Sequence, residues 1–371
     1  MTVHSRRPVV TLAAAAVLPA LVGASSTTEP PDSSVAGGWF TEERCTANED
    51  AGTITYLTGF DYAATASMVD VFVAEDRGFY DELCLDVEVV ASFSTDNYPL
   101  IAGNEAQFAS GGSFSEVVRY SAANDADLVA VVVEGRFPID ALILKPGTAA
   151  ALADLEGATI GVKEAITPAI EAMLAGEGLI EGEDYETVLL DGFDPVAHIA
   201  LDDIDGFPGY KSNEPGALDR AGIDHDLFDP IDYGVPGSFG VIYTSRQFLD
   251  EHPTAAQDFV RATMRGLADA LAHPEAAAES AIALAEAGGN PSFLSIEGEL
   301  FRWQTEAGLL EDSYAEGEPV GVPDLELLQA EVDAYAEVDL FTEELPELTE
   351  AADVELAASV YDASGHVIWV D

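Results

Sequence analysis

Basic side chains are scarce in this sequence: 14 lysines and arginines stand against 69 aspartates and glutamates in 371 residues, a formal charge of −55. Nucleic-acid binding requires clustered lysine and arginine against phosphate, so the composition argues against DNA and RNA as partners. The acids are spread along the chain, which is typical of a solvating surface. Because salt screens the repulsion among such charges, we hypothesise a salt-adapted source organism.

Cysteine is almost absent as well, since Cys45 and Cys84 are the two thiols. Two cysteines without nearby histidines fall short of a zinc set, and the six histidines show no metal-ligand spacing, so we expect neither metal nor cofactor. The sequence also lacks a G-x-S-x-G run and a phosphate loop, which disfavours catalysis. In an exported chain two cysteines more often pair than not, so we predict a Cys45–Cys84 disulfide.

The first 24 residues have the pattern of an export signal. Arg6 and Arg7 precede an apolar run from Val9 to Val22, and the small residues that end at Ala24 suit a cleavage site. Ser25 stands where a lipid-anchored bacterial protein would carry a cysteine, so we expect an unanchored product, periplasmic or at the cell surface. The following stretch, rich in Ser, Thr, Pro and Gly, predicts a flexible leader over residues 25–50.

From residue 51 onward, strand-like and helix-like segments alternate. Thr53–Leu57 is β-rich and Ser67–Asp76 has helical periodicity, whereas Leu128–Val133 and Ile139–Leu144 are apolar runs typical of strands buried on both faces. After Phe239–Thr244 the pattern is almost wholly helical. This order predicts an α/β fold with mostly parallel sheets and a helical C-terminal region, and the length suggests two lobes.

Three segments, taken in order, resemble binding proteins of ABC importers in the branch that binds nitrate, sulfonates, taurine and thiamine-pyrimidine precursors. They are Ala74–Tyr80 with Leu85–Glu88, then Asp154–Val162, then Tyr243–Ser245 with Phe248–Leu249 and His252–Pro253. The resemblance implies the type II periplasmic-binding-protein fold, with two lobes joined by crossover hinge strands. It divides the chain into lobe 1 (51–137), lobe 2 (138–237) and a second part of lobe 1 with the helical C-terminus (238–371).

The implied function is that of an extracytoplasmic solute-binding protein that closes its lobes on one small molecule and then docks on a membrane permease. We expect a monomer without enzyme activity. Two other classes stay open: a pyrimidine-synthesis enzyme of the same fold, and a surface adhesin that would need no cleft.

Ligand groups in open α/β sheets come from loops at the carboxyl ends of strands. Gly206–Pro215 is turn-rich, aromatic and polar, which predicts a loop that presents side chains to a ligand. With the other loops that qualify, the candidate ligand-binding residues are Phe60, Asp61, Tyr62, Gly111, Gly112, Ser113, Arg136, Lys163, Thr167, Tyr210, Lys211, Ser212, Asn213, Glu214, Asp232 and Tyr233.

Several candidates have an equally simple structural explanation. Phe60 and Tyr62 suit core positions under the first helix, and Arg136 suits an ion pair with one of the many nearby acids. Gly111–Ser113 opens a predicted helix whose free amides suit an anion or a carbonyl, whether or not a ligand binds there, and Thr167 is able to cap the next helix. Gly206–Pro215 itself is open to interpretation as a solvated connection.

The supply of tyrosine and phenylalanine in these loops favours a flat heterocycle such as a thiamine-pyrimidine precursor, held by stacking. The alternative ligands are sulfonate, taurine and nitrate, which need donors and cations that converge on an anion. Lys163 or Lys211 supplies such a cation, but the strongly negative field of the whole chain repels anions at long range.

Overall fold

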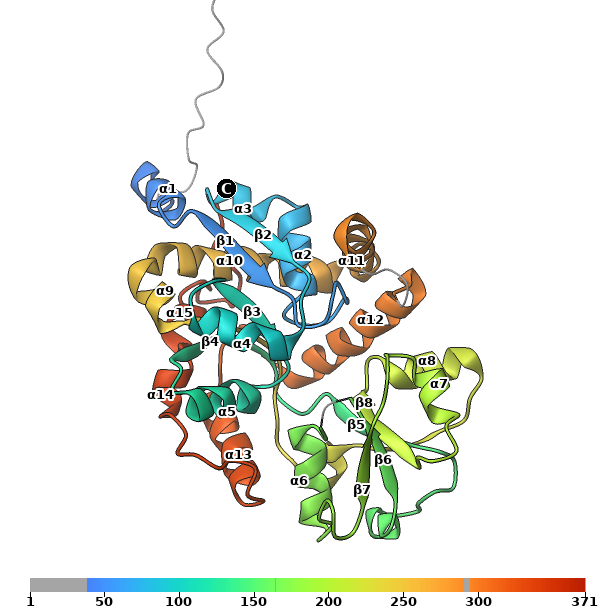
Figure 1. The fold of residues 1–371 in the computed structure, drawn as a ribbon. Coiled ribbons are helices and arrows are strands. Elements are labelled where there is room, and N and C mark those ends of the chain that lie inside the picture. Colours follow the sequence, from blue (N-terminus) through green and yellow to red (C-terminus); the bar gives the residue numbers. More distant parts are fainter. Residues whose placement is uncertain (1–38, 164, 290–293, 371) are drawn as a thin grey trace, which may run out of the picture.

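The structure is a computed structural model that describes residues 39–163, 165–289 and 294–370. The predicted signal segment and the leader as far as residue 38 lie outside these residues. Two lobes are visible, each built around one five-stranded sheet (Figure 1). This arrangement confirms the predicted α/β class and the two-lobed architecture.

The sheet of lobe 1 has the strand order β2-β1-β3-β10-β4, and its first three strands are parallel. β10 returns from the far side of lobe 2 and runs antiparallel to both β3 and β4. The strand bounds are β1 Thr53–Leu57, β2 Asp86–Val90, β3 Phe108–Gly111, β4 Leu128–Gly135 and β10 Phe239–Ser245.

The sheet of lobe 2 repeats this plan with the order β7-β6-β8-β5-β9. β6 is parallel to β7 and β8, whereas β5 is antiparallel to β8 and β9. Each sheet is therefore mixed, with one crossover strand against a parallel set. The bounds are β5 Asp140–Leu144, β6 Thr159–Val162, β7 Glu186–Leu189, β8 Gly206–Tyr210 and β9 Asp226–Phe228.

The prediction of a loop over Gly206–Pro215 is wrong for its first half, because Gly206–Tyr210 forms β8 in the middle of the sheet. Two glycines and Pro208 in five residues are unfavourable for a strand. They are tolerated because β8 pairs with β6 only where Gly206 meets Ile160, so Pro208 needs no amide on that side. Gly206 also packs too closely against Ile143 to carry a Cβ.

Helices cover both sheets, and the C-terminal ones pack mainly on lobe 1 (Figure 1). The core of lobe 1 includes Phe108 and Phe259, whose rings stack at 4.0 Å. The bounds in lobe 1 and the C-terminal region are α1 Glu42–Glu49, α2 Val69–Asp76, α3 Phe79–Glu82, α4 Ser94–Ala102, α5 Phe114–Asn124, α9 Arg246–Glu251, α10 Pro253–Ala272, α11 Pro274–Gly288, α12 Ile296–Ser313, α13 Leu325–Ala336, α14 Leu348–Ala351 and α15 Val354–Ala358. Those in lobe 2 are α6 Pro168–Gly176, α7 Pro195–Ile199, α8 Glu214–Ala221 and the 3-10 turns Leu152–Leu155 and Pro230–Tyr233.

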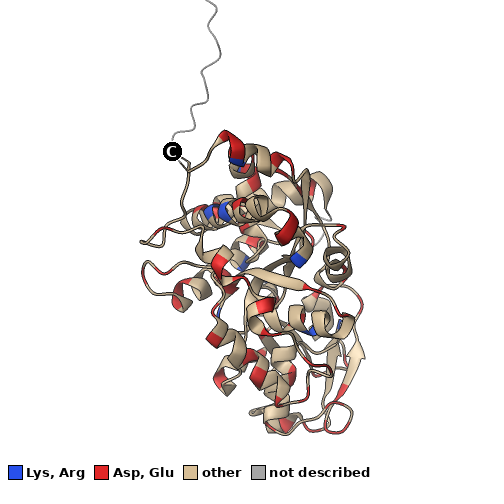
Figure 2. Cartoon of the chain, turned by 90° about the vertical axis from the view of Figure 1, so that its left-hand side faces the viewer, with Lys and Arg blue, Asp and Glu red and all other residues tan. Residues whose placement is uncertain are grey.

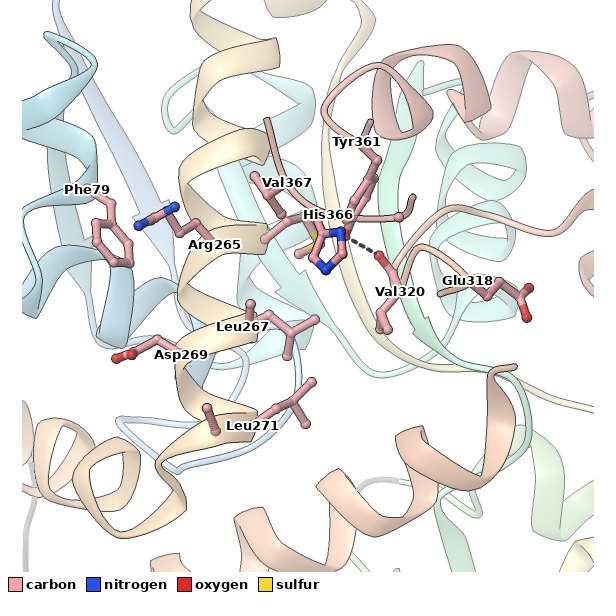
Figure 3. A pocket seen from close by; sticks show the side chains of 14 residues that line it. Phe79, Arg265, Leu267, Asp269, Leu271, Glu318, Val320, Tyr361, His366 and Val367 are labelled. Carbon is pink, nitrogen blue, oxygen red and sulfur yellow. Dashed lines mark hydrogen bonds between the residues drawn. The ribbon is translucent and has the colours of Figure 1, made fainter. Parts of the chain in front are cut away.

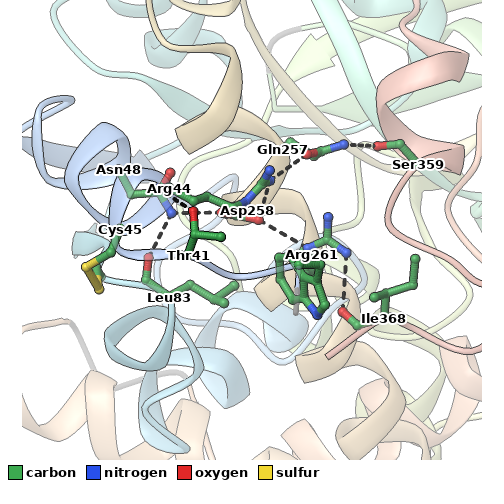
Figure 4. Close-up of polar contacts among 12 residues, drawn as sticks. Thr41, Arg44, Cys45, Asn48, Leu83, Gln257, Asp258, Arg261, Ser359 and Ile368 are labelled. Atoms are coloured by element: carbon green, nitrogen blue, oxygen red, sulfur yellow. Dashed lines mark hydrogen bonds and ion pairs between the residues drawn. A yellow bond between two sulfur atoms is a disulfide. The ribbon is translucent and has the colours of Figure 1, made fainter. Parts of the chain in front are cut away.

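Within the segment expected as a flexible leader, residues 42–49 form α1, which is fixed to lobe 1 (Figure 4). Arg44 donates to Asp258 of α10 at 2.8 Å, and Arg261 donates to the same carboxylate at 3.1 Å. The Cys45–Cys84 disulfide joins α1 to the turn before β2 and confirms the predicted pairing. The leader prediction missed the contact of Arg44 because its partner Asp258 lies more than 200 residues away in the sequence.

Aspartate and glutamate positions occur on most of the elements seen in Figure 2, whereas lysine and arginine positions are few. Among the described residues no helix has both the length and the apolar character required to cross a membrane.

Candidate functional site

Three aromatic rings from different loops meet where the two lobes face each other. Phe60 follows β1 and Phe93 follows β2 in lobe 1, and Phe193 follows β7 in lobe 2. The Phe193 ring lies 5.1 Å from Phe60, edge to face, and 6.0 Å from Phe93, nearly parallel. Phe60 and Phe93 are themselves 5.7 Å apart. We call these three residues the interlobe aromatic cluster.

Lys163, at the end of β6, points its ammonium group at the loop that carries Phe193. Its Nζ donates to the carbonyl of Gly192 and lies 4.7 Å from the centroid of the Phe193 ring. His198 is 3.5 Å from the same Nζ, and its other ring nitrogen contacts the Asp191 carbonyl at 2.8 Å. The cation therefore orients the aromatic loop of lobe 2 through a carbonyl contact and a cation–π contact.

A small polar cavity lies between the lobes and has walls from both of them. Glu116 and Gly112 come from lobe 1, whereas Tyr210 and Thr167 come from lobe 2 and Asp140 from the start of β5. The volume is about 10 Å³, as is that of the neighbouring cavity against Phe193, so each has room for about one water molecule. A heterocycle needs far more space, so binding requires the lobes to separate or side chains to move.

Two carboxyl groups line this cavity, those of Glu116 and Asp140. Burial, reinforced by the charge of Asp140, raises the pKa of Glu116 to about 7. Burial also raises the pKa of Asp140 to about 6. Tyr210 spans the boundary, because its hydroxyl lies 3.6 Å from the position that a Cβ would take at Gly112. The cavity therefore suits ligand groups that donate hydrogen bonds rather than anions.

The helix opening at Gly111–Ser113 is already occupied by side chains of the protein. The amide of Ser113 donates to Glu116 at 3.0 Å and that of Phe114 to Ser238 at 2.8 Å. The amide of Ser115 donates to Glu331 at 3.0 Å. These are the donors that the sequence offered to an anion, so an anionic ligand would have to displace the chain's own acceptors.

The second half of Gly206–Pro215 contacts lobe 1 rather than the aromatic cluster. The Ser212 hydroxyl donates to Glu306 of α12 at 2.6 Å, and the Asn213 side-chain oxygen accepts from Arg302 at 2.8 Å. Glu214 accepts from the amide of Tyr210 at 2.8 Å. Ser212 and Asn213 therefore join the two lobes at the edge of the site, whereas the Glu214 contact lies within lobe 2.

Two of the candidate cations, Lys211 and Arg136, are committed to acids of the protein. Lys211 forms an ion pair with Asp229 at 2.8 Å. Arg136 forms an ion pair with Glu318 at 2.6 Å and stacks 3.9 Å from the centroid of the Tyr314 ring. Arg136 therefore forms an ion pair with a nearby acid, which was the alternative to ligand binding.

Of the remaining candidates, Thr167 lines the polar cavity between the lobes and the other four lie outside it. Tyr62 is a core residue that packs on Phe72 at 5.8 Å, and Asp61 is buried with a left-handed backbone (φ 46°). Asp232 and Tyr233 occupy an exposed turn of lobe 2 and line none of the three cavities described here. Thr167 stands at the N-cap of α6, but its hydroxyl makes no cap hydrogen bond.

A larger groove of about 400 Å³ lies on lobe 1, between α10 and the C-terminal segment (Figure 3). Leu267, Leu271 and Val320 supply apolar walls. Its two carboxylates are engaged elsewhere, Asp269 by Arg77 and Glu318 by Arg136. Every residue that lines it belongs to lobe 1, so an occupant would not couple to lobe closure.

Sequence reasoning missed Phe93, Phe193 and Glu116. The signal for both phenylalanines was present, because each follows the carboxyl end of a parallel strand, where Phe60 was selected by the same rule. Glu116 was hidden by its helical position, since the sequence does not tell which turn of α5 faces lobe 2.

Comparison with known proteins agrees with this architecture. The profile of the family described as NMT1/THI5 like matches residues 65–277, more than half of the chain. The chain belongs to this family. A formylaminopyrimidine-binding protein of Halalkalibacterium halodurans is 29% identical over 238 residues, which make up 62% of this chain and 71% of that protein. A riboflavin-binding protein, RibY, of Chloroflexus aurantiacus is 27% identical over 225 residues, 58% of this chain and 62% of that protein.

The NMT1/THI5-like chain also shares its fold with solved periplasmic binding proteins. The aliphatic sulphonate binding protein SsuA of Escherichia coli superposes with a TM-score of 0.58 at 13% identity, over 81% of this chain and 91% of that one. At this identity the similarity establishes the fold alone. It confirms the periplasmic-binding-protein architecture that the sequence motifs implied.

Proposed function

We propose that this protein is the substrate-binding component of an ABC importer and that it captures a small aromatic heterocycle between its two lobes. Family membership supports the transport role, and the named ligands of the two relatives, formylaminopyrimidine and riboflavin, are both heterocycles. The single observation that carries the ligand class is the interlobe aromatic cluster, in which Phe193 of lobe 2 meets Phe60 and Phe93 of lobe 1. Such rings stack on flat ligands.

The polar side of the site supports the same ligand class. Glu116 and Asp140 accept hydrogen bonds from ring or amino N–H groups, and Tyr210 of lobe 2 reaches Gly112 of lobe 1. Sulfonate, taurine or nitrate is the second candidate and is less well supported. The amides of α5 are occupied, and Lys211 is paired with Asp229.

In the proposed mechanism the ligand touches both lobes only when they are closed, so it favours closure by its higher affinity for that form. The closed protein then docks on a membrane permease, without chemical change to the ligand and as a monomer. Export by a signal peptide that is cleaved near Ala24 belongs to the same proposal. Residues 51–137 with 238–371, and residues 138–237, act as the two moving bodies, with the crossings near Phe137 and Gly237 as hinges.

Isothermal titration with three probes tests the proposal. We expect riboflavin or formylaminopyrimidine to bind and taurine to give no heat above dilution. Tight binding of taurine, together with no binding of either heterocycle, would overturn the ligand class.

The high acidic charge leads us to infer that the protein folds and works in concentrated salt. We expect the melting temperature to rise between about 0.05 M and about 1 M salt, because screening removes repulsion among surface carboxylates. A melting temperature that stays level or falls would exclude the salt adaptation and leave the transport role unaffected.

A further inference from the structure

α12 runs along the boundary between the lobes (Figure 1). It carries three buried charged side chains, two of which bond to lobe 2. Glu299, Arg302 and Glu306 are spaced by three and four residues, so they share one face of the helix. All three are buried, with 2%, 7% and 1% of their surface exposed. Buried charges are expensive unless they are fully hydrogen-bonded, so their partners show what this face does.

Glu306 joins the two lobes through one carboxylate. In lobe 1, Thr65 donates to it at 2.7 Å and the amide of Ala66 at 2.6 Å. From lobe 2, the Ser212 hydroxyl donates at 2.6 Å. Ser212 is completely buried, so no water replaces this contact while the lobes are together.

Arg302 makes a second connection one turn away. Its Nη2 donates to the side-chain oxygen of Asn213 at 2.8 Å, and its Nε donates to Glu299 at 3.1 Å. Glu299 in turn accepts from the amide of Ala64 at 2.7 Å. The carboxylate of Glu306 and the guanidinium of Arg302 are therefore each bound by residues of lobe 1, and each also bonds to one residue of lobe 2.

We propose that Arg302 and Glu306 are positioning residues that fasten lobe 2 to lobe 1 and set how readily the ligand cleft opens. We call these two residues, with Ser212 and Asn213, the α12 latch. The inference rests on the proposed function and deepens it. The cavity between the lobes holds about 10 Å³, so a heterocycle fits there only after the lobes separate. Separation breaks both interlobe hydrogen bonds, and the latch therefore opposes opening.

The latch can be removed from lobe 2 without damage to lobe 1. Ser212→Ala leaves Glu306 with its bonds from Thr65 and Ala66, and Asn213→Ala leaves Arg302 with Glu299. The apolar contact between α13 and α6, in which Tyr335 and Leu340 pack on alanines of lobe 2, stays in place. The double variant thus tests the latch alone.

The first experiment uses no ligand. Small-angle X-ray scattering of S212A/N213A should give a larger radius of gyration than the wild type, because the open form gains population. The matched control N124A/S359A removes the same side chains from exposed positions of lobe 1 and should scatter like the wild type. Melting curves establish that both variants fold. A folded double variant with the wild-type radius would overturn the latch.

The second experiment measures stopped-flow association with riboflavin as the probe. Loss of a charge-assisted hydrogen bond shifts the opening equilibrium by about tenfold or more, so association of S212A/N213A should be faster by about that factor. An unchanged association rate would also count against the latch. If riboflavin fails to bind the wild type, the heterocycle assignment fails while the scattering result still decides the latch, so the two failures are distinguishable.

Discussion

The interior of lobe 1 and the boundary between the lobes bury similar groups but join them differently. Inside lobe 1, the Asp258 carboxylate accepts from two arginines and from Asn48, and a disulfide lies beside it. At the boundary, the carboxylate of Glu306 accepts from neutral hydroxyl and amide groups, and the aromatic cluster lacks covalent or ionic links among its rings.

The two regions therefore differ in how strongly they resist separation. An ion pair that loses its partner in a dry interior leaves an uncompensated charge, so the Asp258 cluster resists separation strongly. Hydroxyls and rings that become exposed are readily solvated or restacked. Substitutions in the first region should therefore change stability, and those in the second should change ligand binding.

The largest effect is expected for Asp258→Asn. The substitution leaves Arg44 and Arg261 without their buried carboxylate, so the free energy of unfolding should fall by about 3–5 kcal/mol, measured by urea denaturation. As a control, Asp269→Asn removes a partly exposed ion pair on the same helix and should cost less than about 1 kcal/mol. Equal losses of unfolding free energy in the two variants would contradict the expected difference between the buried Asp258 cluster and a surface ion pair.

The second prediction concerns how stability depends on pH. It rests on two buried carboxyl groups of lobe 1, those of Asp70 and Glu134. Burial raises the pKa of Asp70 to about 7, and burial beside Asp70 raises the pKa of Glu134 well above its usual range. Between about pH 4 and pH 7 the folded state thus binds more protons than the unfolded state. Stability should therefore decrease as the pH rises through this window, by about 1.4 kcal/mol per pH unit for each proton released.

Asp70→Asn removes one of the two titrating groups and should therefore flatten the dependence of unfolding free energy on pH. Asp96→Asn, an exposed acid on α4, serves as the control and should keep the wild-type slope. A slope that is identical in all three proteins would show that this pair does not titrate between the two states.

Binding, rather than stability, should respond at the boundary. Phe193→Ala removes the lobe 2 ring of the aromatic cluster and should weaken riboflavin binding by about 1–3 kcal/mol, measured by calorimetry. Tyr210→Ala should have an effect of similar size. The control Leu189→Ala lies on the same strand–loop unit, 75% exposed, and should bind as the wild type does. Full affinity in both aromatic variants would contradict the proposed site.

The smallest effect sharpens the comparison most. A double-mutant cycle on Phe60 and Phe193 should yield a coupling of about 0.5–1.5 kcal/mol in the riboflavin affinity, because the rings contact each other across the boundary. The same cycle on Phe108 and Phe259, which stack inside lobe 1, should show coupling in stability and none in affinity. Additive affinities for the first pair would mean that the rings act independently.

The sequence predicted the fold well where the pattern was strong and local. The apolar run at Leu128–Val133 became β4, every residue of which is buried, and the paired cysteines formed their disulfide. β8 was not predicted because its glycines and Pro208 are unfavourable for a strand. They are tolerated because β8 pairs with β6 at one position only, which depends on the neighbouring strands and not on the segment itself. α1 was not predicted because Asp258, which binds Arg44 and fixes α1 to lobe 1, lies far along the chain.

The candidate site was predictable to the level of loops and not of side chains. The rule on strand ends selected the loop of Phe60, which the structure places in the aromatic cluster. It cannot tell which of Tyr210, Lys211 and Ser212 faces the cleft, because successive side chains diverge at the end of a strand. Tyr210 faces the boundary, Lys211 turns to Asp229 and Ser212 turns to α12.

The carboxyl of Glu116 at the first turn of α5 has a consequence for selectivity. This group lies in the same chain as the Ser113 amide that it occupies, so its local concentration stays constant when the protein is diluted or when dissolved anions are abundant. A chloride or sulfate ion in a saline medium competes with a resident group rather than with water. Under the proposed function, this arrangement leaves ring shape and donor pattern, rather than charge, as the basis on which a ligand is selected.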